Sequence, residues 1–274
     1  VTTSFFNRYS SINNEITNNA SVEIGTKKWA SFTSVSYSDF GDLKMGKNRS
    51  HGFNDWGKVF EYSENSNNFY AATATVNPDE NIQRNTGYNQ TDLLQKFFIP
   101  LSEKTDLKLN FQYSTSSDIP RFDRLDEKSG ETLKFAEWYY GPQQRLLISP
   151  QLNINPEKSW VDNIKESRNQ RKLESLERAY REENVDVFSF NGDFMVPVTK
   201  NENKAFTYGF EFLYNDVSSD AYGRTLVVSG NDIIGFSDNL TVQSRYPDGG
   251  SSYVSSAAYL GYRQDLNTKS TLNT

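Results

Sequence analysis

The clearest pattern in the chain is the stretch Phe206-Thr207-Tyr208-Gly209-Phe210-Glu211-Phe212-Leu213-Tyr214. Aromatic rings occupy every second position of this stretch, and the positions between them include Thr207, Gly209 and Glu211. Successive side chains of a β-strand point to opposite faces, so the pattern predicts a strand with one apolar face and one wet face. The stretches 107–114 and 188–198 alternate in the same way.

Weaker alternation extends the prediction to about nine strands and therefore to an all-β, antiparallel fold. The further strands are expected at roughly 22–40, 88–99, 133–152, 161–173 and 252–265, with a partial strand at 3–9. The heavily charged segment 162–183 is less clear, because Leu173, Leu176 and Tyr180 sit at helical spacing. We expect a strand followed by a loop there, with a short helix as the alternative.

The connections between the expected strands alternate in length. Short polar turns are expected near 10–20, 100–105, 154–160 and 199–204, and long polar loops near 41–87, 116–132, 174–183 and 216–251. Up-and-down barrels of the outer membrane have tight turns at one end and long loops at the other. Soluble β-sandwiches carry loops at both ends without this bias. The layout therefore favours a transmembrane β-barrel.

The composition fits two classes of protein. Only 35% of the 274 residues are hydrophobic and the mean hydropathy is −0.73, yet 14% are aromatic, which argues against disorder. No run approaches the ~20 apolar residues of a membrane-spanning helix, and Val1 to Ser10 does not resemble a signal peptide. The chain is therefore either soluble or crosses a membrane as strands, of which only alternate residues face lipid.

The residue inventory excludes several kinds of chemistry. Cysteine is absent and His51 is the only histidine, so disulfides, thiolate sites, multi-histidine zinc sites and a Ser-His-Asp triad lack their components. We expect no metal site and no catalytic residue. The net charge of −6 and the pI near 5.0 argue against a nucleic-acid partner.

Aromatic residues gather toward the ends of the expected strands. At a membrane surface an amphipathic ring buries its body and keeps its polar tip in water. We therefore expect Trp138, Tyr139 and Tyr140 to be membrane-interface anchors. The alternative is that aromatic residues are simply good strand formers.

Several strings resemble one family in the same order along the chain. The segment from Lys28-Trp29-Ala30 to Gly46 is similar to an early barrel strand and its loop in TonB-dependent receptors of the haemoglobin, transferrin and lactoferrin or haem/iron receptor type. The further matching strings are Gly87 to Gln90, Pro120 to Leu125, Glu137-Trp138-Tyr139-Tyr140-Gly141-Pro142-Gln143, Glu166 to Arg168, and Ser244 to Gly249.

The resemblance implies an outer-membrane transporter of a Gram-negative bacterium. Such receptors have a barrel of about 22 strands filled by a plug domain. Residues 1–274 are expected to be the front part of that barrel, incomplete and without the plug. The implied partners are outer-membrane lipid, the TonB-ExbB-ExbD energy-coupling complex acting through the missing plug, and a haem, haem protein or siderophore ligand. The haem or ferric chelate would be a transported ligand and not a cofactor, so no enzymatic activity is expected.

Six residues are candidates for ligand binding in the lumen or the outer loops. His51 lies in a long loop and is a suitable type of ligand for haem iron, although it is as readily a loop residue without a role. The arginines are expected to attract an anionic ligand or, alternatively, to pair with Asp118, Asp123 and Glu166. They are Arg121, Arg124, Arg145, Arg168 and Arg171.

Two other functions fit the same strands. A soluble all-β binding or adhesion module explains the aromatics and the low hydropathy. A β-rich carbohydrate-active enzyme would use a carboxylate pair such as Glu137 and Glu166. Both require the apolar strand faces to meet in a core, whereas a barrel turns them toward lipid.

Overall fold

A computed structural model gives the fold of the chain. It describes residues 1–64, 73–102, 105–154, 157–172, 175–198, 204–267 and 270–274, and within 154–172 and at residue 267 it describes the backbone alone.

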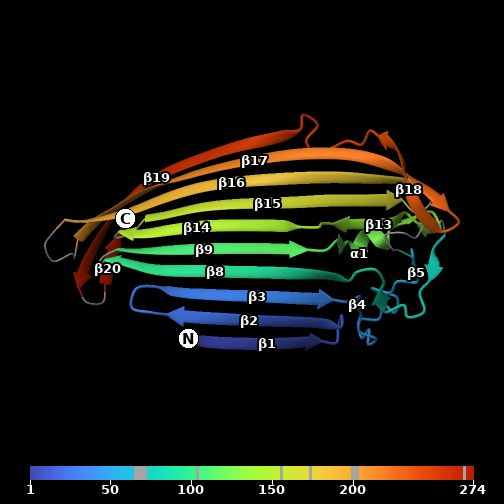
Figure 1. Ribbon diagram of the computed structural model, residues 1–274, viewed down its shortest axis with the longest axis horizontal. Coiled ribbons are helices and arrows are strands. Elements are labelled where there is room, and N and C mark those ends of the chain that lie inside the picture. The colour runs from blue at the N-terminus through green and yellow to red at the C-terminus, as the bar shows by residue number, and fades with distance from the viewer. Residues whose placement is uncertain (65–72, 103–104, 155–156, 173–174, 199–203, 268–269) are drawn as a thin grey trace.

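The described residues form one large antiparallel sheet of 14 strands (Figure 1). Eleven of the strands follow one another as neighbours in an up-and-down order, with further pairings only at one end of the sheet. These eleven are β1 (Thr2–Ser10), β2 (Glu15–Gly25), β3 (Ala30–Phe40), β8 (Tyr88–Ser102), β9 (Thr105–Ser116), β14 (Gln144–Ile154), β15 (Glu157–Lys172), β16 (Glu177–Pro197), β17 (Lys204–Ser229), β19 (Gly250–Asn267) and β20 (Ser270–Asn273).

The remaining elements lie in the connections at one end of the sheet. Three belong to the main sheet: β10 (Ile119–Pro120), β13 (Phe135–Tyr140) and β18 (Asp232–Leu240). The others are β4 (Leu43–Lys44), β5 (Glu61–Tyr62), β6 (Thr75–Val76), β7 (Ile82–Gln83), α1 (Phe122–Leu125), β11 (Lys128–Ser129) and β12 (Thr132–Leu133).

The all-β, antiparallel, up-and-down prediction is confirmed, and most of the predicted strands are present. Two predicted strands were wrong, because each is divided in two. The stretch 22–40 contains a turn at 26–29, where Thr26 Oγ1 accepts the backbone N–H of Trp29 at 3.0 Å, so β2 and β3 are separate strands. The stretch 133–152 is divided at Gly141 and Pro142 into β13 and β14.

The predicted bias of the connections is also confirmed in its main feature. The long connections 41–87 and 117–143 lie at the same end of the sheet, here called the loop end, and short connections join the strands at the opposite turn end (Figure 1). Most residues of the predicted turns at 100–105, 154–160 and 199–204 belong to strands or lie outside the described residues. The turn predicted at 10–20 was wrong, because it spans only 11–14 and lies at the loop end.

Two predicted loops were wrong because strands continue through them. Most of 174–183 belongs to β16, and much of 216–251 belongs to β17 and to its hairpin with β18. The helix considered within 162–183 is absent from the described residues, which are strand over 157–172 and again from Glu177. Beyond the aromatic rows both faces of these strands are largely polar, and the alternation of apolar and polar residues stops. The backbone pairing of β16 with β17 nevertheless continues there.

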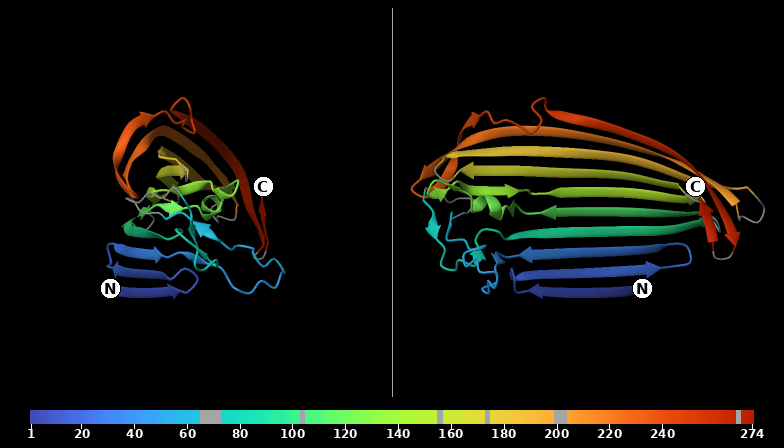
Figure 2. Two further views of the ribbon diagram at one scale, coloured as in Figure 1. Left: turned by 90° about the vertical axis from the view of Figure 1, so that its right-hand side faces the viewer. Right: turned by 180° about the vertical axis from the view of Figure 1, so that it is seen from behind.

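The sheet is curved but does not close on itself. Its edge strands, β1 and β20, have no pairing with each other in the described residues (Figure 2). Few apolar side chains are buried in the described part of the sheet and its connections. They are Leu133, Phe135, Ala136, Trp138, Leu147, Ala205 and Leu226. Four of these belong to the β12–β13 segment at the loop end, so most of the apolar side chains of the long strands are not in a core.

One cross-strand rung shows how the strands fit together. Gly209 of β17 lies between Asp193 of β16 and Tyr259 of β19. The hydroxyl of Tyr259 donates a hydrogen bond to Asp193 Oδ1 at 2.6 Å, so its ring passes over Gly209. A Cβ atom added at Gly209 would lie 2.5 Å from Tyr259 Cε1. The glycine therefore leaves room for a link across three strands.

Substitution of Gly209 by alanine is expected to lower the free energy of unfolding by about 1–3 kcal/mol, because the added methyl overpacks the rung. Gly25→Ala in β2 is the matched control, since a Cβ there meets nothing within 4 Å. Urea unfolding of the full-length protein measures both changes. Equal stability of the two variants would contradict this account of the rung.

Candidate functional site

The apolar strand positions lie together on one face of the sheet, here called the outer face. Cross-strand partners share a face, so the register identifies its members. One rung runs through Phe111, Ile148, Phe188, Tyr214 and Val254 on β9, β14, β16, β17 and β19, with the backbone of β15 between β14 and β16. Most of these side chains are exposed, with Phe188 at 45% and Val254 at 58%.

The outer face changes character at a defined line. One rung nearer the loop end, β16, β17 and β19 carry Asp186, Asp216 and Ser252. On β9 and β14 the same rung still carries Tyr113 and Leu146, and the polar residues begin one rung later. The boundary therefore crosses the strands obliquely. We call the apolar region on the turn-end side of this line the apolar band.

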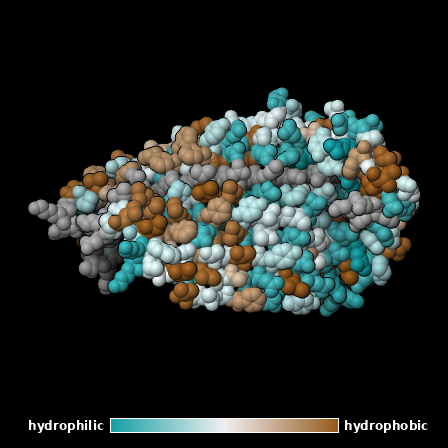
Figure 3. Space-filling model, in the orientation of Figure 1, coloured by the Kyte–Doolittle hydropathy of each residue, from teal (hydrophilic) through white to brown (hydrophobic). Residues whose placement is uncertain are grey.

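The register defines the members of the apolar band on the described side chains. They are Val22, Val35, Tyr37, Leu93, Phe97, Ile99, Leu107, Leu109, Phe111, Tyr113, Leu146, Ile148, Leu152, Phe188, Phe190, Phe194, Val196, Phe206, Tyr208, Phe210, Phe212, Tyr214, Val254, Leu260 and Tyr262. The space-filling view likewise has hydrophobic residues gathered toward the turn end and more hydrophilic ones toward the loop end (Figure 3).

The opposite, inner face is lined by polar side chains that bond to one another. Glu15 accepts from Arg8 at 2.6 Å and from Thr17 at 2.8 Å, and Thr17 bonds to Ser38 at 3.0 Å. Asn19 donates to the hydroxyls of neighbouring β3 serines. Farther along the sheet, Ser114 bonds to Asp92 and Asn153 bonds to Asp106. Such a face is suited to water or to a polar partner.

Two of the predicted ligand arginines are held by carboxylates of their own loop. Arg121 lies over the ring of Trp138, 4.6 Å from its centroid, and donates through Nε to Asp123 Oδ1 at 2.9 Å. These bonds lower the pKa of Asp123. Arg124 bonds to Glu127 at 2.5 Å. The alternative of structural pairing is therefore confirmed for Arg121 with its predicted partner, whereas Arg124 pairs with a different carboxylate.

The other three arginines lie on long strands. Arg145 is on the inner face of β14, opposite Ser114, and lines a hollow with Ser34 and Asp92. The backbones of Arg168 and Arg171 lie in β15, opposite Tyr140 and Glu137 of β13. Their side chains lie outside the description, as does that of Glu166, so the predicted roles of these side chains stay predictions.

The aromatic string of β13 differs from what we expected for membrane anchors. Trp138 is 2% exposed and packs edge to face on Tyr140, with ring centroids 5.0 Å apart. Its ring lies under Arg121 within the loop-end structure and does not reach an outer surface, contrary to the prediction. Tyr139 and Tyr140 are half-buried, and their role as anchors stays a prediction.

Glu137 forms an ion pair that the sequence did not suggest. Its Oε1 lies 2.6 Å from Nη2 of Arg178, and the two residues are only 2% and 8% exposed. Asp118 lies near this pair, and its pKa is raised to about 6, first by burial and then by the Glu137 carboxylate. Glu137 and Arg178 are 41 positions apart, so no local pattern relates them. The ion pair with Arg178 therefore links Glu137 of β13 to β16.

Arg178→Met should lower the free energy of unfolding by about 3–5 kcal/mol, because it removes a buried cation that lies 2.6 Å from the buried Glu137 carboxylate. The double variant Glu137→Leu/Arg178→Met should recover most of the loss. Arg245→Met serves as control, since Arg245 is exposed and its pair with Glu183 should contribute at most about 1 kcal/mol. A double variant as unstable as Arg178→Met in urea unfolding would rule out the pair as the cause.

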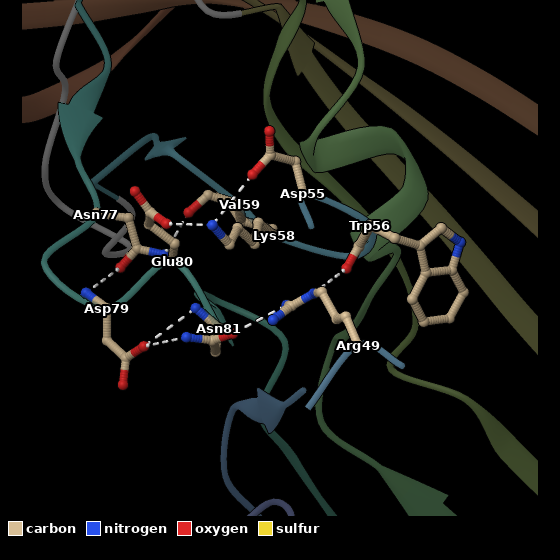
Figure 4. Close-up of polar contacts among 9 residues, drawn as sticks. All are labelled: Arg49, Asp55, Trp56, Lys58, Val59, Asn77, Asp79, Glu80 and Asn81. Carbon is tan, nitrogen blue, oxygen red and sulfur yellow. Dashed lines mark hydrogen bonds and ion pairs between the residues drawn. The ribbon is translucent and has the colours of Figure 1, made fainter. Parts of the chain in front are cut away.

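His51 lies in a loop that polar contacts hold in shape (Figure 4). Arg49 donates to the carbonyl of Trp56 and to Asn81 Oδ1, each at 2.9 Å, and Lys58 lies 3.1 Å from both Asp55 and Glu80. Asn77 closes the loop through the carbonyls of Val59 and Ile82, both at 2.8 Å. These contacts join residues 49–59 to residues 77–82, so the described part of the loop around His51 is cross-linked.

His51 makes contacts within its own loop, and its role as an iron ligand stays a prediction. Its Nδ1 accepts the backbone N–H of Phe53 at 3.1 Å, and its ring lies against Phe53 and Trp56. The described residues contain no group of three His, Cys, Asp or Glu side chains placed to hold a metal ion.

No protein-family model matches the chain, and no curated protein matches it. Within the described part of the chain, no helix has both the length and the apolar character needed to cross a membrane.

Proposed function

We propose that the chain forms part of the wall of an outer-membrane β-barrel, in a TonB-dependent receptor that imports haem or chelated iron. The observation that carries the proposal is the apolar band: exposed rows on one face of a single curved sheet, bounded by a line beyond which the same face is polar. Transmembrane barrels have this outer surface, with a polar interior behind it.

The dimensions of the band support a bilayer. From Phe206 to Tyr214 the row extends roughly 27 Å at about 3.4 Å per residue. At the inclination of about 40° that barrel strands adopt, it rises roughly 20 Å, close to the apolar height of about 25 Å in such barrels. Inclined strands also explain why the boundary crosses the rungs obliquely, because a membrane surface cuts tilted strands at different rungs.

The other features agree with this arrangement. The inner face, with its bonded Glu15, Thr17 and Asn19, suits a wet lumen or the surface of a plug. The long connections lie at the end where β16 and β17 continue past the band, which is where the extracellular loops of a barrel belong. The resemblance of the strings from Lys28 to Gly249 adds the receptor type and, with it, the TonB complex as energy source.

A soluble binding or adhesion module is less well supported. Such a protein would pack the apolar faces of two layers together and bury them. Here the rows belong to one face of one sheet and are exposed, and the described core is small. The cargo follows from the resemblance alone.

The absence of cysteine allows a direct test of the band. In intact cells, Asp216→Cys should react with a membrane-impermeant maleimide and Phe212→Cys should not, because only the first lies outside the bilayer. Phe212→Cys should become reactive after the protein is solubilised and unfolded. Labelling followed by gel-shift analysis of the outer-membrane fraction measures both.

The two sites differ by four residues on the same face of β17, so they are matched in strand and direction. Equal labelling of both variants in intact cells would mean that the band faces water. Recovery of the full-length protein in the aqueous fraction without detergent would exclude the barrel altogether.

The cargo is tested separately by deleting the gene and supplying haem as the sole iron source. Growth is expected to fail on haem and to persist on ferrous salts, which enter by other routes. Unimpaired growth on haem would remove this cargo while leaving the barrel intact.

A further inference from the structure

A cavity of about 470 Å³ lies at the loop end, where β16 begins. Its walls come from the ends of β13, β16 and β17 and from the segment 240–242, which leaves β18. This volume is within the range of pockets that bind small molecules. Among the candidate ligand residues whose side chains are described, none lines it.

Two arginines line the cavity, but they are three residues apart on β16, so their side chains lie on opposite faces of the strand. Arg181 is the one that shares a face with Gly223 and the segment 240–242. Arg178 is nine-tenths buried and uses Nη2 for Glu137, while its buried Nε has no acceptor among the described residues. Arg181 donates through Nε to the carbonyl of Gln243 at 3.1 Å, and its buried Nη1 also lacks an acceptor there. The one carboxylate among the described lining residues is Glu177, whose side chain is exposed.

The surrounding fold keeps the cavity in shape. Segment 240–242 packs against β17 at Gly223, where an added Cβ would lie 2.9 Å from Val242 Cγ2. The bond from Arg181 to Gln243 fastens the same segment to β16. Leu240, Val242 and the buried Phe135 provide an apolar wall beside the guanidinium of Arg181.

We propose that this cavity binds a small organic anion, with a carboxylate or phosphate group on the guanidinium of Arg181 and its carbon skeleton against the apolar wall. A buried N–H without an acceptor costs stability, and an anionic oxygen is its strongest partner. The planar guanidinium suits both carboxylate and phosphate geometry. The site is independent of the proposed transport function, because a soluble protein with this sheet would contain the same cavity.

Calorimetric titration of the purified full-length protein with phenyl phosphate and with benzoate tests the proposal and distinguishes the two anionic groups. One of them should bind at a single saturable site, and inorganic phosphate should bind more weakly because it lacks the apolar part. Arg181→Gln should weaken binding about tenfold or more through loss of a charge-assisted bond, with Arg181→Lys between it and the parent.

Arg263→Gln is the matched control, since it removes the same charge from β19 near the turn end and should bind like the parent. Thr241→Trp blocks the cavity without changing charge and should abolish binding even where Arg181→Gln folds poorly. Absence of saturable binding at millimolar concentrations, or parent-like binding by Thr241→Trp, would overturn the proposal. Neither result would bear on membrane insertion.

Discussion

The period of two along each strand, fixed by the register between strands, is the constraint on which this structure depends. A shift of one residue in any pairing would move the apolar row of that strand to the inner face and its polar row to the outer face. The rung from Phe111 to Val254 keeps its apolar character across β9, β14, β16, β17 and β19 because every pairing preserves this register. Cross-strand hydrogen bonds between polar side chains of the inner face stabilise the same register.

How much of this the sequence predicts depends on whether a strand has an apolar row. The stretches 107–114 and 206–214 alternate cleanly, and the sequence predicts both as strands. Asp216, Ser218 and Asp220 continue the same outer row of β17 without apolar residues, so the sequence pattern predicts a loop there instead. Hydrophobic periodicity reports burial or lipid contact and not hydrogen bonding, so it ends where the strand enters water. Turns at 26–29 and at Gly141 were missed because each interrupts a row only briefly.

Site residues were harder to predict than strands, because pairing at the loop end joins distant parts of the chain. Arg121 and Asp123 are two residues apart and were correctly paired as an alternative. Glu137 and Arg178 are brought together only because β13 and β16 flank β15, a neighbour relation that no local pattern contains. The same is true of Arg181 and Gln243, which meet where the chain turns back from β18.

The two ends of the sheet therefore differ in how their side chains are packed. Toward the turn end the strands need only alternate, since a bilayer would solvate the outer rows and polar side chains satisfy one another inside. At the loop end the buried groups pack against one another. They include Trp138, the Glu137–Arg178 pair and the segment that packs on Gly223. An interior that buries charged groups among aromatic and aliphatic ones leaves buried N–H donors that have no acceptor among the described residues. That imbalance is the physical reason to expect a small anion there and not within the regular part of the wall.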